Sequence, residues 1–575
     1  MVRVRRLSIL LLVTLLLLLV LAASAFAQQP TRVLLVVMDQ MRPEYAEQYD
    51  MTNVLWLQEN GLHFPNAYVG HMQSDTVVSH NVIASGLFPK HMGWSDEAIR
   101  DIDGLLDYGE GAIVETGALG YNDYVKLIEA AGDYPKIGDY LHEKFPGTIV
   151  AMIGQKGYQV ESMAAANADY WVRMGSRKAL LDLPSYISND PAVLEPMGID
   201  PLPARWRGPS GNVPDYIKTD YRFYISSDVK VGDDYGTAST APAWMYYEDG
   251  RYVPGRLAGR ESGDGWVANA ATAIMENEDW SGLFLNFSAI DKMGHMWGGG
   301  DVDDLLNYTW DPNSNFDWVH LPFAAKNADN ALGRLIAKLK ELGQFEETLI
   351  VVLADHGGQD SERFFGGSNV YDGGNSAGWY AGAWVPGWGT DPMVPNWSDG
   401  PPALAPLMAT GNVRFSYQST SIHTYLIDQS WSKKIAAAKV MGTLPGVVAT
   451  YVKSKDNDSY KVFRAGRTCT PMTSAEKSWW KLHGQELVNT MAFEGSADVV
   501  GLLADHTNYS VWGDHGGHQR QVQRVPMVWY NPGICQGVKK AEIRLADVMP
   551  TILRTLGIEQ TSPTDGKAYK IPIAQ

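Results

Sequence analysis

The chain has 575 residues, of which 45% are hydrophobic, so it is long enough to bury a large core or to form two or three domains. Its formal net charge is -18 at pH 7, and a protein this acidic is poorly suited to hold a long polyanion. We therefore expect no nucleic-acid polymer as a partner. A small phosphate-containing substrate would have to meet a local cationic site, such as a bound metal ion.

The N-terminus has the pattern of a secretory signal peptide. Arginines at positions 3, 5 and 6 precede a Leu- and Val-rich run over residues 7–22, and Ala25-Phe26-Ala27 forms an A-x-A cleavage pattern. We expect residues 1–27 to be removed and the mature protein to be secreted or periplasmic, with no membrane contact. An uncleaved N-terminal membrane anchor is the alternative, because the apolar run approaches spanning length.

The chain contains only two cysteines, Cys469 and Cys535. An exported protein folds in an oxidising compartment, so we favour a disulfide between these two residues. Two free thiols are the alternative. Neither cysteine belongs to a CxxC pair of the metal-binding or redox type.

Five continuous apolar runs predict parallel strands that are buried on both faces. They cover residues 32–40, 148–154, 282–291, 348–358 and 525–533. Residues 324–343 carry an apolar stripe along one face and predict a helix, and residues 545–558 predict a final helix. Strands that alternate with helices indicate an α/β fold with a sheet covered on both faces.

Two stretches interrupt this alternation. Residues of about 160–265 are rich in Asp, Tyr, Pro and Gly, and residues of about 360–480 include a segment dense in Gly, Pro and Trp over 377–401. We interpret both as insertions that form cap-like lobes over the carboxyl edge of the sheet, where open α/β folds bind ligands. The Trp residues could stack on a ligand, but burial within the lobe is the favoured interpretation.

Carboxylates and imidazoles gather at the ends of the predicted strands. Asp39 ends the first strand, Asp291 and His295 follow the third, Asp355 and His356 end the fourth, and His515 and His518 precede the fifth. Such side chains at one edge of a sheet are the ligands that a divalent metal needs, because zinc takes N and O donors at about 2.0–2.2 Å. Two ions about 4 Å apart can hold a phosphoryl group between its attacking and leaving oxygens.

The segment "SDTVVSHNVIASGLFPKHMG" at 74–93 begins with a cluster that is typical of a helix N-cap. Locally, Thr76 is simply a capping residue. Its hydroxyl could also act on an anion that binds at the helix N-terminus.

Together with the strand-end motifs, this segment resembles the threonine-nucleophile branch of the alkaline phosphatase superfamily. That branch includes the type I phosphodiesterases and nucleotide pyrophosphatases and a group of periplasmic alkaline phosphatases. The resemblance implies a mostly parallel sheet flanked by helices, with inserted cap-like lobes, in one catalytic domain over residues 28–575. It covers the strand-end motifs and the final helix, and it does not firmly cover the two insertions.

The resemblance also implies roles for single residues. Thr76 is the expected nucleophile, and it binds the first metal ion together with Asp39, Asp355 and His356. The ligands expected to activate the hydrolytic water are Asp291, His295 and His515, and His518 is the alternative to His515. The resemblance implies two divalent ions, with zinc favoured, and structural or supporting roles for His80, His91, His506 and Asp514.

Two positions bear on the substrate. The periplasmic phosphatases of this branch carry Lys-x-Arg where this chain has Lys156 and Tyr158, and they carry an Asn where this chain has only Ser95, Asp96 and Glu97 nearby. A monoester carries roughly two negative charges near neutral pH, so the loss of a cation and the gain of carboxylates weaken its binding more than that of a diester. Lys156 also has a simpler interpretation as a surface lysine.

The sequence therefore predicts an exported two-metal phosphohydrolase that acts through a phosphothreonine, with a modest preference for a phosphodiester or a nucleotide pyrophosphate. The first alternative is a periplasmic alkaline phosphomonoesterase. A sulfatase is excluded because its C/S-x-P-x-R motif is absent. A non-catalytic protein that binds a glycan or lipid is disfavoured, because the set of expected metal ligands is complete.

Overall fold

The computed structural model describes residues 29–174, 181–182, 192, 205–223, 225–226, 263–297, 320–360, 363–364, 383–384, 402–510 and 513–573. The predicted signal peptide and nearly all of the Trp-rich segment 377–401 lie outside these residues. Among the helices in the described ranges, none has both the length and the apolar character needed to cross a bilayer.

A nine-stranded sheet forms the centre of the molecule, in the order β10-β7-β6-β12-β1-β13-β24-β2-β25. Its members are β10 (Ser210–Asn212), β7 (Tyr170–Arg173), β6 (Ile149–Gly154), β12 (Trp280–Phe287), β1 (Arg32–Met38), β13 (Thr348–Leu353), β24 (Met527–Tyr530), β2 (Leu62–His63) and β25 (Gly537–Val538). The strands β6, β12, β1 and β13 run parallel to their neighbours in this group, and their apolar side chains are almost wholly buried. The prediction of an α/β fold with a mostly parallel sheet is confirmed.

The fifth predicted strand runs the other way. β24 pairs antiparallel with β13, so the prediction that it is parallel is wrong. Its continuous apolar sequence indicates burial on both faces but carries no information on direction. Because β24 is reversed, it begins at the edge where β1, β12 and β13 end. A motif that precedes β24 therefore lies beside the motifs that follow the parallel strands.

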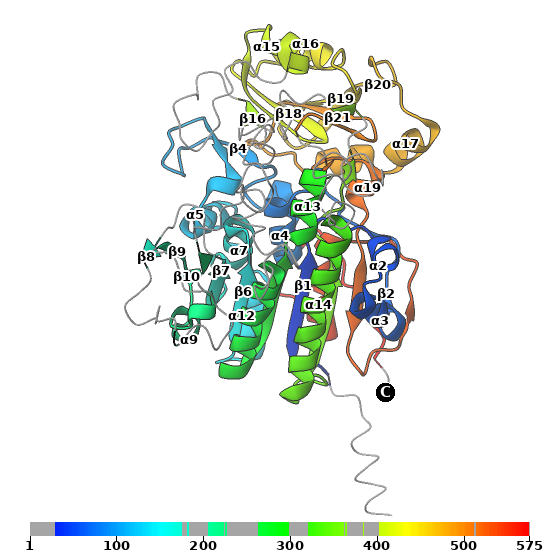
Figure 1. The fold of residues 1–575 in the computed structure, drawn as a ribbon. Helices are drawn as coiled ribbons and strands as arrows, with labels where there is room; N and C mark the ends of the chain where they lie inside the picture. Colours follow the sequence, from blue (N-terminus) through cyan, green and yellow to red (C-terminus); the bar gives the residue numbers. More distant parts are fainter. Residues whose placement is uncertain are drawn as a thin grey trace, which may run out of the picture.

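Helices flank the central sheet. α12 (Gly263–Asn277) and α14 (His320–Glu341) pack against each other and stand in front of the sheet in Figure 1. A second group consists of α4 (Thr76–Ser85), α6 (Ile137–Lys144), α7 (Gly157–Ala164) and α20 (Val548–Thr555), in which α4 contacts the other three. The two predicted helices correspond to α14 and to α20, which is preceded by a short 3-10 turn at Leu545–Asp547.

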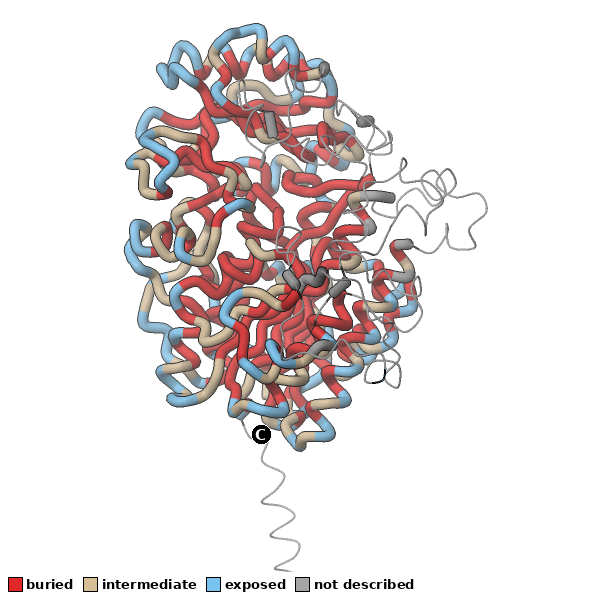
Figure 2. The backbone as a smooth tube through the Cα atoms, turned by 60° about the vertical axis from the view of Figure 1, so that its left-hand side comes forward, coloured by how far each residue is buried: buried red, intermediate tan, exposed pale blue. Residues whose placement is uncertain are grey.

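A second sheet of six strands forms an upper lobe, which lies above the central sheet in Figure 1. Its order is β16 (Ala383–Trp384), β17 (Val413–Gln418), β18 (Ser421–Leu426), β21 (Val499–Leu503), β19 (Val447–Lys453) and β20 (Tyr460–Ala465). The helices α15 (Ala405–Met408) and α16 (Trp431–Met441) pack together on it. Two hydrophobic clusters distinct from the main core lie in this lobe, and one of them also includes Met72, Ala98 and Ile113 from segments outside the lobe. Figure 2 shows buried backbone in both parts of the molecule.

The described residues between 160 and 265 do not all form a separate lobe. β7 pairs with β6, and β10 pairs with β7, so both strands belong to the central sheet. The alternation of strand and helix therefore continues through β6, α7 and β7, beyond residue 160. A small sheet of β8 (Leu181–Asp182), β9 (Arg205–Arg207) and β11 (Ile225–Ser226) accounts for other described residues of this stretch.

The remaining described elements are short. Four two-stranded sheets pair β3 (Ala67–Tyr68) with β26 (Ile543–Arg544), β4 (Ala98–Asp101) with β5 (Ala112–Glu115), β14 (Gln359–Asp360) with β23 (Gly513–Asp514), and β15 (Arg363–Phe364) with β22 (Thr507–Asn508). The helices not yet named are α2 (Tyr45–Gln48), α3 (Thr52–Asn60), α5 (Tyr121–Ala130), α9 (Asp215–Lys218), α13 (Ala289–Trp297), α17 (Ser474–Trp479), α18 (Gln485–Asn489) and α19 (Arg520–Gln523).

The two cysteines are unpaired and exposed, so the favoured disulfide prediction is wrong. Cys469 lies in the upper lobe, where its N–H donates to the carbonyl of Gly442, whereas the N–H of Cys535 donates to the carbonyl of Pro572 after β24. The two residues thus belong to different parts of the fold. Cysteine count alone could not reveal this separation.

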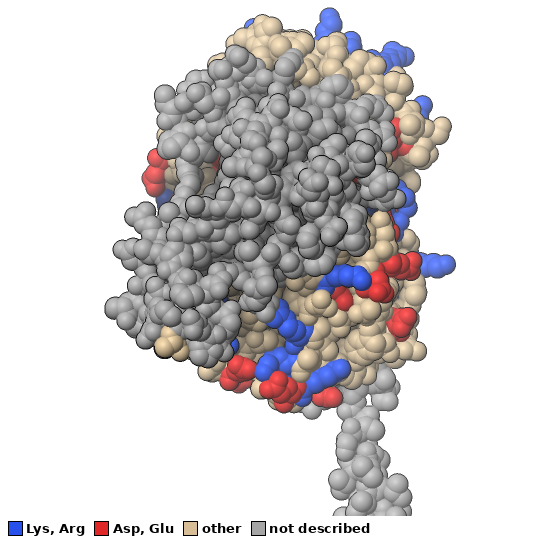
Figure 3. All heavy atoms as spheres, viewed as in Figure 1, with Lys and Arg blue, Asp and Glu red and all other residues tan. Residues whose placement is uncertain are grey.

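Charges of both signs occur together on the visible surface. In Figure 3, Lys and Arg lie among Asp and Glu over the lower part of the face shown. On this part of the surface the two signs of charge are mixed.

Candidate metal centre

The predicted ligands converge at one edge of the central sheet. Asp39 directly follows β1, Asp355 and His356 follow β13, and Asp291 and His295 lie on α13, the helix after β12. His515 comes from the loop between β23 and α19, before the reversed strand β24. Seven ligands were expected, and the structure brings six of them into two groups of three, with the seventh, Thr76, beside one group.

The first trio consists of Asp39, Asp355 and His356, whose ligand atoms all lie within 4.8 Å of one another. His356 Nε2 is 3.4 Å from Asp39 Oδ1 and 3.6 Å from Asp355 Oδ2. The Thr76 hydroxyl joins this trio, since its Oγ1 is 3.4 Å from Asp39 Oδ1 and 3.3 Å from His356 Nε2. All four side chains are buried.

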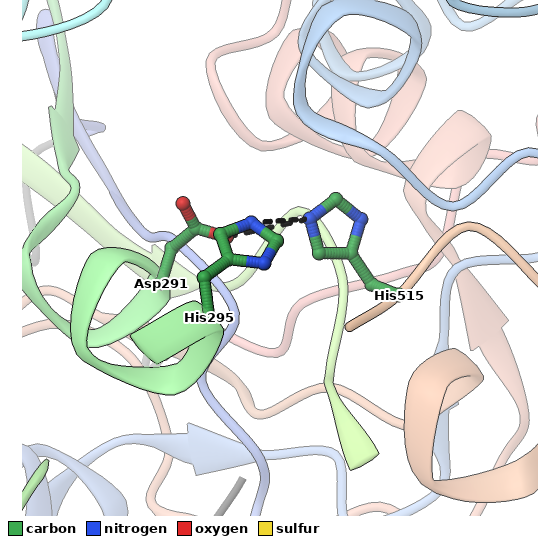
Figure 4. A group of neighbouring side chains, drawn as sticks. All are labelled: Asp291, His295 and His515. Atoms are coloured by element: carbon green, nitrogen blue, oxygen red, sulfur yellow. Dashed lines mark hydrogen bonds and ion pairs between the residues drawn. The ribbon is translucent and has the colours of Figure 1, made fainter. Parts of the chain in front are cut away.

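The second trio consists of Asp291, His295 and His515, which also lie within 4.8 Å of one another. Figure 4 shows Asp291 and His295 projecting from α13 towards His515 on the opposing loop. Asp291 Oδ1 is 3.2 Å from His295 Nε2 and 3.4 Å from His515 Nε2, and the two Nε2 atoms are 3.2 Å apart. The two trios are neighbours, because the rings of His356 and His515 stack with centroids 3.7 Å apart.

Backbone carbonyls orient all three imidazoles in the same way. The Nδ1 atoms of His356, His295 and His515 lie 3.0, 2.8 and 3.1 Å from the carbonyl oxygens of Gly357, Gly513 and Ser74, respectively. A carbonyl only accepts, so each Nδ1 carries the proton and donates. In its neutral form each ring then presents the lone pair of Nε2 to its trio, which is the arrangement that outer hydrogen bonds impose on metal-binding histidines. Burial opposes protonation of His295, but Asp291 raises its pKa to about 9, so this ring must lose a proton to bind a metal ion.

The residues present fit a pair of divalent ions. Asp291 Oδ1 and Asp355 Oδ2 are buried and have no hydrogen-bond partner among the described residues, and each belongs to one trio. A buried carboxylate oxygen without a donor is costly unless a cation satisfies it. The donor set contains nitrogen and oxygen but no sulfur, which suits zinc and other divalent first-row metals.

The electrostatics of the centre favour positive charge beside its carboxylates. Burial, followed by repulsion from Asp39, raises the pKa of Asp355 to about 7. Burial opposes ionisation of Asp291, but His295 and Lys156 hold the pKa of this carboxyl well below its usual range. Burial lowers the pKa of both His356 and His515, which keeps these imidazoles neutral and able to donate a lone pair.

Lys156 lies between the two trios. Its Nζ is 2.8 Å from Asp39 Oδ2, 2.6 Å from Asp291 Oδ2 and 3.3 Å from Thr76 Oγ1. The side chain is only 8% exposed, so its interpretation as a surface lysine is excluded. Burial lowers the pKa of Lys156, but Asp291 and Asp39 more than offset this and raise it well above its usual value. A fixed cation therefore adjoins the Thr76 hydroxyl.

Asp75, and not Thr76, caps helix α4. The Asp75 side chain accepts a hydrogen bond from the Val78 N–H at 3.0 Å, while Thr76 is the first residue of the helix. The helix ends at Ser85 and is followed by the C-cap residue Gly86, whose φ of 69° is the left-handed conformation that glycine tolerates. Because Asp75 satisfies the cap, the Thr76 hydroxyl is left to face the first trio at the positive end of the helix dipole.

Asn286 is a supporting residue that sequence reasoning missed. Its Nδ2 lies 3.1 Å from Asp39 Oδ2 and 3.0 Å from His80 Nε2, and His80 Nδ1 lies 2.8 Å from the Thr76 carbonyl. Asn286 and His80 therefore connect Asp39, a candidate ligand, to helix α4, which begins with Thr76. The available signal was a single amide inside the otherwise apolar run that forms β12.

The other predicted residues lie outside the trios. His518 is buried, with its pKa lowered to about 4 by burial, and it joins neither trio. His91 is exposed and pairs with Asp565 at 2.8 Å, and the N–H of His506 donates to Gln359 Oε1. Asp514 accepts from the His515 N–H at 2.9 Å and lies 3.8 Å from His295 Nδ1, which places it behind the second trio.

The acidic residues near the centre differ in accessibility. Asp96 is fully buried and bonds to His423 Nδ1 at 2.5 Å, so it is not available to a substrate. Glu97 is partly exposed and accepts from the Tyr417 hydroxyl at 2.6 Å. Tyr158, the second residue of α7, is also partly exposed. Glu97 and Tyr158 are thus the candidates for contact with a substrate.

One family model matches part of the chain. Residues 204–372 match the family Type I phosphodiesterase / nucleotide pyrophosphatase, and this stretch carries Asp291, His295, Asp355 and His356. No curated protein sequence matches the chain.

Two solved structures, both of the alkaline phosphatase PafA, share this fold. Wild-type alkaline phosphatase PafA has a TM-score of 0.55 at 15% identity, over 94% of this chain and 98% of that one. A mutant of PafA has a TM-score of 0.52 at 15% identity, with coverage of 92% and 96%. Murine ectonucleotide pyrophosphatase/phosphodiesterase 5 has a TM-score of 0.48 at 12% identity, with coverage of 93% and 97%.

Proposed function

We propose that the chain is a phosphoester hydrolase of the alkaline phosphatase superfamily, and that it cleaves phosphate esters with two divalent metal ions and with Thr76 as the nucleophile. One observation carries this proposal. Two trios of nitrogen and oxygen ligands adjoin each other, and the Thr76 hydroxyl lies within 3.4 Å of two members of the first trio.

In the proposed reaction the Thr76 oxygen attacks phosphorus, and the bond from phosphorus to the leaving alcohol or nucleotide breaks. Water then attacks the phosphothreonine, releases the phosphate product and restores the Thr76 hydroxyl. When bound, the metal ions would stabilise charge on the phosphoryl oxygens and favour ionisation of the attacking hydroxyl and water. Lys156 would hold positive charge 3.3 Å from the attacking oxygen throughout.

We propose zinc at both sites. Each trio combines one or two carboxylates with one or two imidazoles, a donor set that zinc binds with about three protein ligands and an open position for a substrate or water. The hydrogen bonds from Nδ1 support this assignment, because they point each Nε2 atom towards its trio before the metal arrives.

A phosphodiester or nucleotide pyrophosphate is the favoured substrate class. Tyr158 and the partly exposed Glu97 supply no cation for a second phosphate charge. A phosphomonoesterase is the second candidate, and Lys156 is the observation that favours it, because its buried ammonium could bind one oxygen of a dianionic group.

We further propose that the mature protein is exported after loss of residues 1–27, which the pattern of the N-terminus supports. On this proposal the catalytic domain spans residues 28–575, with the upper lobe as a cap over the metal centre. Sequencing the N-terminus of the protein recovered from a secreting host tests the cleavage, and an intact residue 1 would instead support an N-terminal anchor.

Hydrolysis assays on purified protein test the function directly. A bis-aryl phosphate diester and the matching aryl monoester should both be tried, with metal content measured on the same sample. Turnover that is lost on chelation and restored by zinc supports a metallohydrolase. A metal-loaded protein that hydrolyses neither ester, or a fully active protein without metal, would refute the proposal.

A further inference from the structure

The turn between β17 and β18 in the upper lobe contacts the loop that carries His515. The Thr420 N–H donates to the carbonyl of His515 at 3.2 Å, and the Ser421 hydroxyl donates to the carbonyl of Gly516 at 2.5 Å. In return, Gln519 Nε2 donates to the carbonyl of Thr420 at 2.7 Å. The lobe therefore holds the backbone of the metal-site loop directly at the ligand.

Ser74 holds the same loop from the other side. Its carbonyl accepts from His515 Nδ1 at 3.1 Å and from the Gly516 N–H at 3.0 Å. Its hydroxyl donates to the carbonyl of Gly517 at 3.1 Å. The loop that carries His515 is thus held by Ser74, directly before helix α4, as well as by the upper lobe.

A buried hydrogen-bond chain supports the contact from the lobe. Asp96 Oδ2 lies 2.5 Å from His423 Nδ1, and His423 Nε2 lies 3.0 Å from Ser421 Oγ. Ser421 has one hydroxyl hydrogen, which goes to the Gly516 carbonyl, so His423 Nε2 is the donor to Ser421. Asp96, His423 and Ser421 are fully buried, and a satisfied chain of this kind is rigid.

The chain begins in a segment of the central domain that enters the lobe. We call residues 96–100 the anchor segment. Besides Asp96, its Glu97 accepts from the Tyr417 hydroxyl, its Ala98 carbonyl accepts from the Tyr425 hydroxyl, and its Arg100 pairs with Asp498 at 3.2 Å.

The anchor segment forms hydrogen bonds with two facing residues of the lobe, Tyr417 and His423. Tyr417 and His423 are cross-strand partners on β17 and β18, so adjacent residues of the anchor segment hold both sides of this strand pair. Within this interface, Asp96 is the residue of the anchor segment that bonds to His423.

We propose that His423 is a positioning residue for the second trio: through Ser421 it holds the His515 loop, so this one contact of the upper lobe with the loop sets the affinity of that trio for its metal ion. This inference rests on the proposed function, in which the second trio binds metal. Because coupling of two binding events is reciprocal, metal in the second trio should in turn stabilise the docked lobe.

Metal titration of three variants of the full chain tests the inference. His423→Ala and Ser421→Ala each break the chain to Gly516, whereas Tyr425→Phe removes a bond between β18 and the anchor segment that does not reach the loop. Changes behind a metal ligand typically weaken metal binding by about 10–100-fold. We expect that loss for the second zinc equivalent in His423→Ala and Ser421→Ala, with the first equivalent unchanged and with turnover recovered in excess zinc. Tyr425→Phe should bind both equivalents as the wild type does.

The outcomes separate this inference from the proposed function. A wild-type chain that binds fewer than two zinc ions overturns both. If the wild type binds two, unchanged second-site affinity in His423→Ala and Ser421→Ala overturns the inference alone. An equal loss in Tyr425→Phe would also overturn it, because the effect would then come from lobe docking in general. Should His423→Ala fail to fold, Ser421→Ala, which removes one oxygen atom, decides the matter.

Discussion

The two trios are built in different ways. The first trio follows β1 and β13, which are adjacent parallel strands of the central sheet, and its three residues lie within three positions of a strand end. The pairing of two buried strands is therefore enough to bring Asp39, Asp355 and His356 together.

The second trio is not carried by a pair of adjacent strands. Two members lie on α13, and the third comes from a loop held between Ser74 and the β17–β18 turn of the upper lobe. This trio is complete only when helix, loop and lobe are all in place. The comparison shows that one candidate metal centre can combine a site fixed by a sheet with a site fixed by docking, and we expect the second to be the weaker and more easily disturbed.

The largest effect is expected from Thr76→Ala, which tests whether the first trio holds the nucleophile. The variant keeps all six ligands of the trios but loses the attacking oxygen, so turnover should fall by at least about 10³-fold while both metals stay bound. Steady-state kinetics together with metal analysis measure this. Covalent phosphate trapped on a residue other than Thr76 would show that the assignment is wrong.

A smaller effect is expected from His515→Ala, which removes a ligand of the second trio only. Loss of a direct ligand should weaken the second metal by about 100-fold or more, beyond the effect of an outer-shell change, and should leave the first metal in place. His518→Ala is the matched control, because His518 is a nearby buried histidine outside both trios. If His518→Ala depletes the metal and His515→Ala does not, the ligand must be reassigned.

Tyr158→Arg tests whether selection of the substrate lies outside both trios. An added guanidinium can make a charged contact worth roughly 1.5–3 kcal/mol with a phosphate oxygen. The ratio of kcat/KM for an aryl monoester to that for a diester should therefore rise by about 10–100-fold, with unchanged metal content. A wild-type protein that already prefers the monoester by tenfold would contradict this role for Tyr158.

The smallest effect is a difference in metal affinity between the trios of the wild-type protein. Stepwise chelation should empty the second trio first, with an affinity gap of about tenfold, because its ligands come from separately placed elements. Metal analysis at each step, with the melting temperature followed in parallel, measures the order of loss. If the first trio empties first, the contrast between a sheet-based and a docking-based site does not hold.

The strand-end residues could be recognised without the structure because they depend on local patterns. Each buried strand is an unbroken apolar run, and a polar residue that directly follows such a run must lie at the sheet edge. This reasoning placed Asp39, Asp355 and His356 correctly relative to their strands. It also placed Asp291 and His295, since α13 starts directly after β12.

Strand direction, burial of a lysine and the separation of the two cysteines could not be predicted from neighbouring residues in the sequence. The apolar run of β24 is compatible with either direction, and burial of Lys156 depends on carboxylates that lie 117 and 135 positions away in the chain. The separation of Cys469 from Cys535 is likewise a property of the folded chain.

By itself, the sequence determined which side chains lie at strand ends and therefore which residues are candidates for metal ligands, because periodicity and apolar runs are properties of neighbouring residues. Only the tertiary structure decided that Asp75 caps α4, that His515 rather than His518 meets Asp291, and that the upper lobe holds the His515 loop. Each of these depends on a hydrogen bond or contact whose geometry is set by packing of the whole fold. Such contacts arise only when segments distant in the chain are brought to within a few ångströms of each other.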